Sequence, residues 1–153
     1  MTMRKFDASY AAKATQVKLV GYLAAVDAAL TRLQPTSSIV LFGGIALSRP
    51  YPGGTMVSIV NGGVVGMTRT LAVELAPIRV NGVSPGAVVD SPRCQRRIAA
   101  SSQFAGMMDA LAARAPARRL TEMADIVQAV LFLMDNRGVN GVDLEVDGGL
   151  RLV

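Results

Sequence analysis

Three short apolar segments alternate with longer helical segments, and this order restricts the fold more than any other feature of the sequence. We expect strands at residues 37–42 (SSIVLF), 78–83 and 142–146, and helices at residues 8–33, 55–76 and 122–134. Strands separated by helices pair in parallel through right-handed crossovers. The sequence therefore predicts an α/β fold with three parallel strands and crossover helices.

The 153 residues are predicted to form a single domain, because 51% hydrophobic and 18% charged residues suffice for one core and no internal repeat is visible. Its segments are a helix at 1–35, a strand-helix-strand unit at 36–92, an arginine-rich, lid-like segment at 93–120, and a helix with the final strand at 121–153.

The residue types exclude several kinds of chemistry. Histidine is absent and Cys94 is the single cysteine, so we expect no imidazole catalysis, no intramolecular disulfide and no metal site. The N-terminal MTMRKFDASY lacks the apolar core of a signal peptide, and the longest apolar tract, at residues 17–30, is interrupted by Lys18 and Asp27. We therefore expect a cytoplasmic protein that does not cross a membrane.

The composition of individual elements leads to expectations about packing. Residues 8–33 are rich in Ala and Leu and should form one long, largely buried helix, and SSIVLF should form a strand buried on both faces. Thr121 should cap the helix that begins at Glu122.

Gly62, Gly63 and Gly66 lie inside the helix expected at 55–76. Each interior glycine lowers the stability of a helix by roughly 0.5–1 kcal/mol relative to alanine. Either another backbone packs closely at these glycines, or they have no packing role.

Three motifs resemble the C-terminal half of a short-chain dehydrogenase/reductase, and they occur in that family's order: GMTRTLAVELAPIRVNGVSPG, LTEMADIVQAVLFLM and NGVDLEVDGG. The resemblance implies a partial Rossmann-like, doubly wound fold. The N-terminal dinucleotide-binding half has no counterpart, since no G-x-x-x-G-x-G follows a strand. The resemblance also implies NAD or NADP as cofactor and NAD(P)(H)-dependent oxidoreduction of a carbonyl or alcohol substrate.

The family's catalytic serine, tyrosine and lysine are absent from the positions that the resemblance aligns. Gly44 takes the serine position, Val57 the tyrosine position and Asn61 the lysine position. A second alignment, with Ser38 as the serine and Tyr51 as the tyrosine, has the right spacing but offers no lysine four residues later. We therefore expect the isolated chain to have no oxidoreductase activity.

Lys13 and Asn61 resemble an exchange found in the ketoreductases of polyketide synthases. In those enzymes a lysine on the preceding helix and an asparagine on the tyrosine helix exchange places, and an amine can reach the same ribose hydroxyls from either helix. The alternative is that Lys13 is an ordinary solvated residue of its helix.

The loop SPGAVVDS resembles the family's segment that lies along the nicotinamide. Asp90 stands where the family usually has threonine, so it would bring negative charge near the cofactor. Together with the exchanged asparagine, this loop supplies the candidate cofactor contacts, which are Asn61, Pro85, Gly86, Val88 and Ser91.

The whole net charge of +5 lies between residues 93 and 119, a segment that contains six arginines and a single acidic residue, Asp109. These arginines either attract an anionic partner, such as a phosphopantetheine-bearing carrier protein or a coenzyme A thioester, or they are solvated side chains of a loop. Nucleic-acid binding is not expected, since only Phe104 accompanies them as a stacking side chain. The six are Arg93, Arg96, Arg97, Arg114, Arg118 and Arg119.

Two functions remain open. One is the oxidoreductase that the family resemblance implies, and the other is a catalytically silent remnant that acts as an assembly or regulatory partner or is a truncated gene product. The helices at 8–33 and 55–76 resemble the family's dimer interface, and the strand at 38–43 should be an apolar edge. We therefore expect a homo-oligomer.

Overall fold

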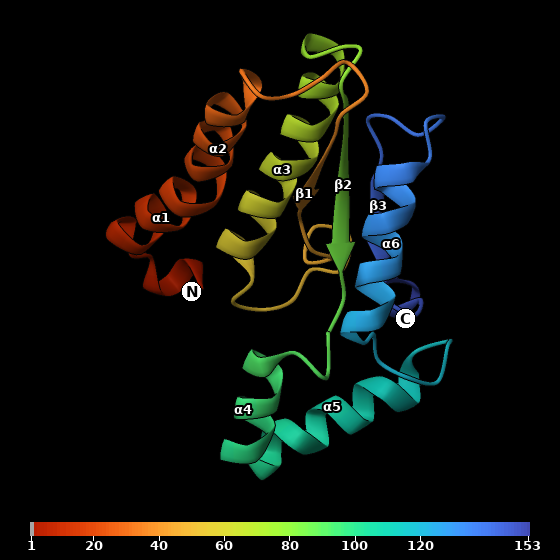
Figure 1. Ribbon diagram of the computed structural model, residues 1–153. Helices are drawn as coiled ribbons and strands as arrows, with labels where there is room; N and C mark the ends of the chain where they lie inside the picture. Colours follow the sequence, from red (N-terminus) through yellow and green to blue (C-terminus); the bar gives the residue numbers. More distant parts are fainter. Residues whose placement is uncertain (1) are drawn as a thin grey trace.

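A three-stranded parallel sheet forms the centre of the molecule, as the computed structural model of residues 2–153 shows (Figure 1). The strands are β1 (Ser38–Phe42), β2 (Arg79–Pro85) and β3 (Asp143–Val146), in the order β1-β2-β3. Ser38 pairs with Arg79 and Gly82 with Asp143. The predicted α/β fold with three parallel strands is confirmed.

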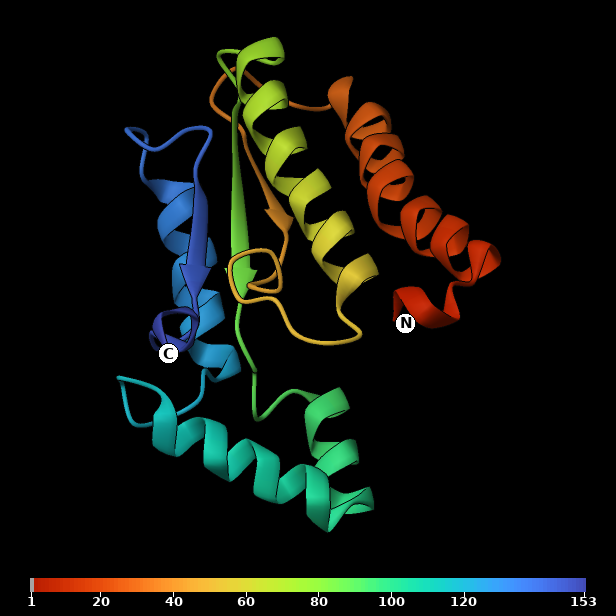
Figure 2. The ribbon, with the colours of Figure 1, turned by 180° about the vertical axis from the view of Figure 1, so that it is seen from behind.

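Helices cover both faces of this sheet. In Figures 1 and 2, the N-terminal helices and α3 lie on one side and α6 on the other, while α4 and α5 lie beyond the carboxyl ends of the strands. The helical segments are η1 (Met3–Lys5), α1 (Ala8–Thr15), η2 (Gln16–Val20), α2 (Gly21–Leu30), α3 (Thr55–Glu74), α4 (Pro92–Ala100), α5 (Ser102–Arg114), α6 (Met123–Asp135) and η3 (Leu150–Leu152).

The core between α3 and the sheet holds the domain together. Val64 of α3 and Val80 of β2 are fully buried in it, and Val26 of α2 completes the cluster from outside α3. α3 has the length and apolar composition of a membrane-crossing helix, but buried core helices of soluble proteins share these properties. Of its most apolar 18-residue stretch, 44% is buried inside the molecule. Its place in the core accounts for its composition.

The N-terminal helix differs from the expectation in continuity and burial. α1, η2 and α2 follow one another without a break, but η2 is a wider π turn within the otherwise α-helical segment. Val26 is the one residue of these three elements that is buried, and Val17 is 68% exposed. The prediction of a largely buried helix is therefore wrong: Leu19 and Tyr22 pack against the core, but other apolar side chains, such as Val17 and Leu23, are not covered within residues 2–153. SSIVLF likewise buries Leu41 but leaves Phe42 40% exposed.

The interior glycines of α3 have different surroundings. A Cβ at Gly63 would lie 2.7 Å from the Leu19 side chain, so the absence of a side chain at Gly63 leaves the space that Leu19 of η2 occupies. A Cβ at Gly66 would meet nothing within 4 Å. A side chain, and not another backbone, therefore packs at Gly63. Gly66 has no packing role within the described chain.

Both ends of α6 are held by side chains. Glu122 caps its N-terminus and forms a reciprocal capping box with Asp125. The prediction that Thr121 is the cap is wrong, because Thr121 pairs with Val88 in an isolated β-bridge. At the other end the buried Arg79 guanidinium donates to carbonyl oxygens at and beyond the C-terminus. These acceptors are the carbonyl oxygens of Leu133, Met134, Asn136 and Val139.

Candidate functional site

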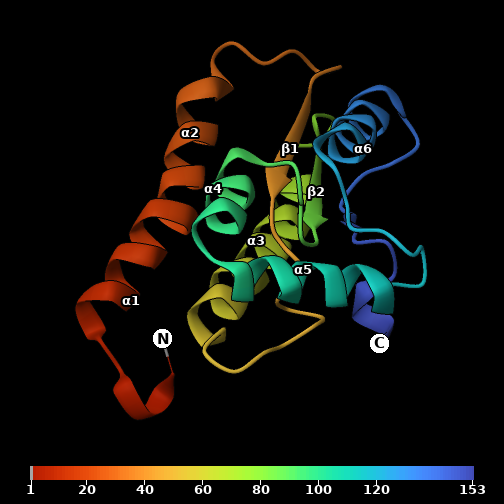
Figure 3. The ribbon, with the colours of Figure 1, turned by 90° about the horizontal axis from the view of Figure 1, so that it is seen from below.

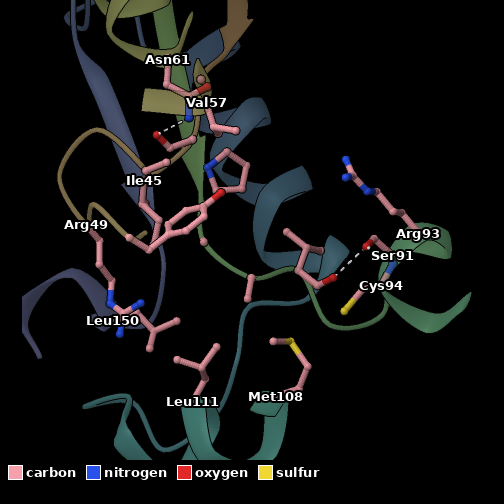
Figure 4. A pocket seen from close by; sticks show the side chains of 18 of the residues that line it. Ile45, Arg49, Val57, Asn61, Ser91, Arg93, Cys94, Met108, Leu111 and Leu150 are labelled. Carbon is pink, nitrogen blue, oxygen red and sulfur yellow. Dashed lines mark hydrogen bonds between the residues drawn. The ribbon is translucent and has the colours of Figure 1, made fainter. Parts of the chain in front are cut away.

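A cavity of about 830 Å³ lies at the carboxyl ends of the strands, between the sheet and the two lid helices α4 and α5. In Figure 3, which views the molecule from below, these two helices lie in front of the sheet, and Figure 4 shows the cavity from close by. Parallel α/β sheets bind ligands at this edge. The cavity is lined by the three aligned catalytic positions, Gly44, Val57 and Asn61, and by the other four candidate cofactor contacts, Pro85, Gly86, Val88 and Ser91.

Lys18, and not Lys13, lies beside Asn61. The Lys18 ammonium donates to Asn61 Oδ1 at 2.9 Å and to the Gly43 carbonyl oxygen at 3.1 Å, and Lys18 lines the cavity. Lys13 is exposed on α1 and does not line it. The expected proximity of Lys13 to Asn61 is therefore wrong: Lys18 is the lysine that contacts Asn61, and Lys13 is a solvated residue of its helix, which was the alternative. Burial lowers the pKa of the Lys18 ammonium from its usual value.

The π turn explains why Lys18 occupies this position. η2 spans Gln16–Val20, so Lys18 stands at its centre, where the wider turn changes the direction of the side chains relative to a regular helix. Spacing along a regular helix gave no reason to prefer Lys18. The sequence offered one signal, a charged residue inside an otherwise apolar tract.

Gly44 and Asn61 depend on each other. Asn61 is 3% exposed, and its Nδ2 donates to the Gly44 carbonyl oxygen at 3.0 Å. A Cβ at Gly44 would lie 2.8 Å from the same Nδ2. A side chain at position 44 would therefore displace the Asn61 amide from its observed place.

No tyrosine occupies the expected acid position. Val57, on the first turn of α3, presents an apolar side chain to the cavity (Figure 4). Tyr51 also lines the cavity, from the loop before α3, and is 51% exposed. Ser38 lies at the opposite end of β1 and donates to the Leu133 carbonyl oxygen, so the second alignment does not bring its two residues together.

The side chains of the loop after β2 serve the fold. Ser91 Oγ accepts from the Cys94 backbone N–H and donates to the Val88 carbonyl oxygen, which caps α4. Asp90 Oδ1 accepts from the Met123 backbone N–H at the start of α6. The negative charge that we expected beside the cofactor is therefore directed to a helix terminus.

The six lid arginines separate into groups. Arg93 and Arg97 line the cavity, and Arg97 also stacks over Phe104 at 3.9 Å. Arg119 forms a bidentate ion pair with Asp125, and Arg118 donates to the Ala113 carbonyl oxygen. Only part of the arginine-rich segment thus faces the cavity, and the ion pair neutralises another part.

The cavity wall is cationic and otherwise mostly apolar. Its charged lining residues within residues 2–153 are Lys18, Arg49, Arg93 and Arg97, with no carboxylate among them. Arg49 comes from the loop after β1 and was not singled out from the sequence. Met108, Leu111 and Leu150 form the apolar floor (Figure 4). Such a cavity favours a ligand with an apolar body and a negative charge.

Comparison with known proteins decides the family. Residues 2–151 match the family model described as enoyl-(acyl carrier protein) reductase. The short-chain dehydrogenase/reductase malC of Malbranchea aurantiaca is 35% identical over 120 residues, which are 78% of this chain and 44% of malC. The chain belongs to the short-chain dehydrogenase/reductase family. The resemblance drawn from its motifs is confirmed.

Other members of the short-chain dehydrogenase/reductase family agree in sequence and in structure. The 3-oxoacyl-[acyl-carrier-protein] reductase FabG of Haemophilus influenzae is 36% identical over 118 residues, 74% of this chain and 46% of that protein. A small-chain dehydrogenase solved in complex with NADPH superposes with a TM-score of 0.86 at 27% identity, covering 99% of this chain and 68% of its own. The chain spans about half the length of these curated relatives.

Proposed function

We propose that the cavity binds the nicotinamide and ribose end of NAD(P)(H), and that the 153-residue chain alone does not catalyse oxidoreduction. One observation carries the proposal: a lysine and an asparagine, hydrogen-bonded to each other at 2.9 Å, line a cavity at the carboxyl ends of a parallel sheet. Bound nicotinamide would supply or accept a hydride. Lys18 and Asn61 are the residues that would hold its ribose.

The residues fit one end of the cofactor. Lys18 has one N–H more than its two acceptors use, which leaves a donor for a ribose hydroxyl. Pro85, Gly86 and Val88 border the same cavity and offer backbone groups to a carboxamide. No glycine-rich turn in these 153 residues could hold the pyrophosphate, so we expect weaker binding than in a complete dinucleotide fold.

The proposed lack of activity rests on the absence of a proton donor from the aligned tyrosine position. Hydride transfer to a carbonyl leaves an alkoxide, which must receive a proton in or soon after the transition state. Val57 cannot supply one, and Gly44 offers no hydroxyl to polarise the carbonyl.

The charge of the cavity supports an anionic substrate or partner. Arg93 and Arg97 of α4 and Arg49 of the loop after β1 surround an apolar floor. Two groups of relatives named above act, by their names, on acyl groups of a carrier protein. An acyl group on an anionic carrier, or a coenzyme A thioester, combines the same apolar and negative character. We propose this class of ligand for the chain.

A second candidate function, a silent assembly partner, is favoured by the apolar side chains exposed on α1, η2, α2 and α3. Val17 and Val73 are 68% and 78% exposed, which is costly unless a partner covers them. This function requires no ligand. Failure to bind NADPH would leave it as the better explanation.

Titration of the chain with NADPH, followed by backbone amide NMR, tests the proposal. We expect the Gly44 and Asn61 resonances to shift, and Lys18→Met to weaken binding about fivefold or more. Lys13→Met is the matched control and should bind like the unmodified chain. Absence of any shift near Gly44 at millimolar NADPH would contradict cofactor binding, and steady loss of reduced nicotinamide with a carbonyl substrate would contradict the lack of activity.

A further inference from the structure

A continuous series of hydrogen bonds connects the cavity wall with the far strand of the sheet. Lys18 Nζ donates to Asn61 Oδ1 at 2.9 Å, and Asn61 Nδ2 donates to the Gly44 carbonyl oxygen at 3.0 Å. The Gly44 backbone N–H donates to Ser84 Oγ at 3.0 Å. Ser84 Oγ donates to the Asp143 carboxylate, at 2.8 Å to Oδ1 and 3.0 Å to Oδ2. We call these five residues the polar chain.

Every hydrogen bond in the polar chain points the same way. Each residue between the two ends accepts from the side of Lys18 and donates toward Asp143, so the series begins at a cation and ends at an anion. Hydrogen bonds in such a series polarise one another and strengthen together when they are shielded from water. Asn61 and Ser84 meet this condition, because they are 3% and 1% exposed.

The two glycines after β1 make room for the polar chain. A Cβ at Gly43 would lie 2.5 Å from Ser84 Oγ, and a Cβ at Gly44 would lie 2.8 Å from Asn61 Nδ2. Larger residues would therefore interrupt the series at both of its central bonds. The turn, the asparagine and the serine form one packed unit.

Asp143 has no stronger partner than Ser84. It forms no ion pair within residues 2–153, whereas its neighbour Glu145 pairs with Arg151 at 2.7 Å. The other charged groups that act on Asp143 are Glu145 on the same strand and Arg69 on α3. Its carboxylate is half-buried, and burial raises its pKa from the usual value. A half-buried carboxylate that forms no ion pair lowers the stability of the fold when it is ionised.

We propose that Asp143 is a positioning residue, which acts through Ser84, Gly44 and Asn61 to hold the Lys18 ammonium at the cavity wall. The carboxylate orients the Ser84 hydroxyl toward itself, which leaves Ser84 Oγ as an acceptor for the Gly44 N–H. The Gly44 carbonyl then faces the Asn61 amide, and Asn61 Oδ1 faces Lys18. Asp143 thereby sets the place of a group that it does not touch.

Lysine Cε NMR tests the proposal without any ligand. The chain contains three lysines, Lys5, Lys13 and Lys18, so the Lys18 signal is assigned by its absence in Lys18→Met. In Asp143→Asn the measured pKa of Lys18 should fall by at least about half a pH unit, because Asn61 Oδ1 is no longer held in place as an acceptor for the ammonium. Asp109→Asn, the same change at an exposed residue of α5, should leave it unchanged. An equal Lys18 pKa in both variants would overturn the proposal.

A second measurement needs no substitution at Asp143. In the unmodified chain, the Lys18 Cε signal should show an additional inflection at acidic pH as Asp143 becomes protonated, and Ser84→Ala should abolish this inflection. A Lys18 signal that is flat through the acidic range would overturn the proposal, even if Asp143→Asn does not fold.

The third readout, affinity for NADPH, depends also on the proposed function. Asp143→Asn should weaken binding about threefold or more in the unmodified chain and by much less in Lys18→Met, because its effect passes through Lys18. Equal weakening in both backgrounds would contradict the positioning role. If no form binds NADPH but the Lys18 pKa still responds to Asp143, the proposed function fails and the positioning role stands.

Discussion

Asp125 and Asp143 show how the surroundings of a single residue decide its charge. Arg119 donates two hydrogen bonds of 2.7 Å to Asp125, and together with the Glu122 backbone N–H this lowers the pKa of Asp125 to about 2. Asp143 has only a hydroxyl partner, so burial dominates and raises its pKa. The first aspartate stabilises the fold when it is ionised, and the second does so when it is neutral.

The Asp125 pKa predicts part of the acid sensitivity of the protein. Because the folded pKa of about 2 lies below the ordinary value of 3.8, the stabilisation is present above pH 3.8 and is lost as the pH falls toward 2. Asp125→Asn should lower Tm near neutral pH and should lose less Tm than the unmodified chain between these two pH values. Thermal unfolding by circular dichroism checks this, with Asp109→Asn as control. Parallel Tm curves for the unmodified chain and Asp125→Asn would contradict it.

Several site residues could be predicted because the carboxyl ends of parallel strands meet at one edge. Gly44 follows β1, Gly86 follows β2, and both line the cavity as the strand order implied. Lys18 could not be predicted, since its direction depends on a π turn that no local pattern indicates. The role of Asp90 could not be predicted either, because its partner, the Met123 N–H, is 33 residues away in the sequence.

At the scale of elements, α6 depends on a residue of the strand that it covers. Arg79 is 9% exposed and donates four hydrogen bonds, of 2.5 to 3.3 Å, to carbonyl oxygens near the C-terminus of α6. The last carbonyls of a helix have no partners within it, and they carry the negative end of its dipole. One guanidinium therefore satisfies both the hydrogen bonds and the charge of this end.

Arg79→Met should lower the free energy of unfolding by about 3 kcal/mol, because one buried and three partly buried hydrogen bonds to carbonyl oxygens would be lost. The free energy of unfolding of Arg79→Lys should lie between those of the unmodified chain and of Arg79→Met, since one ammonium cannot reach all four acceptors. Urea unfolding measures the change, with Arg137→Met on the exposed turn after α6 as control. A loss no larger than that of the control would show that α6 does not need this cap.

The order and approximate bounds of the elements could be predicted from periodicity and from the prolines and glycines between them. The three strands and α6 begin and end within two residues of the expected positions. Burial of the N-terminal helix could not be predicted. An Ala- and Leu-rich sequence shows that a face is apolar, but not which polypeptide covers it.

At the scale of the whole molecule, apolar side chains that residues 2–153 leave exposed gather on one layer. α1, η2, α2 and α3 form that layer, and Val17, Leu23, Ile59 and Val73 of these elements are between 48% and 78% exposed. Burial of such side chains contributes about 25 cal/mol per Å² of apolar surface. A second copy of the chain is the partner that the family resemblance implies.

We expect a dimer or larger assembly at micromolar concentration. Val73→Glu and Val17→Glu should shift it toward the monomer, because each places a charge in the buried surface. Leu152→Glu, an equally exposed position in η3, is the control and should leave the assembly intact. Light scattering coupled to size-exclusion chromatography measures the mass. A strictly monomeric unmodified chain would contradict the expectation.

The two glycines that follow β1 also restrict the evolutionary paths open to this protein. A serine at position 44 conflicts with the Asn61 amide, and a lysine at position 61 would place a second ammonium beside Lys18. A serine at position 44 thus requires a change at Asn61, and a lysine at position 61 requires a change at Lys18. The glycine turn, Asn61 and Lys18 are therefore coupled positions, and the usual catalytic residues can be introduced here only by concerted substitutions.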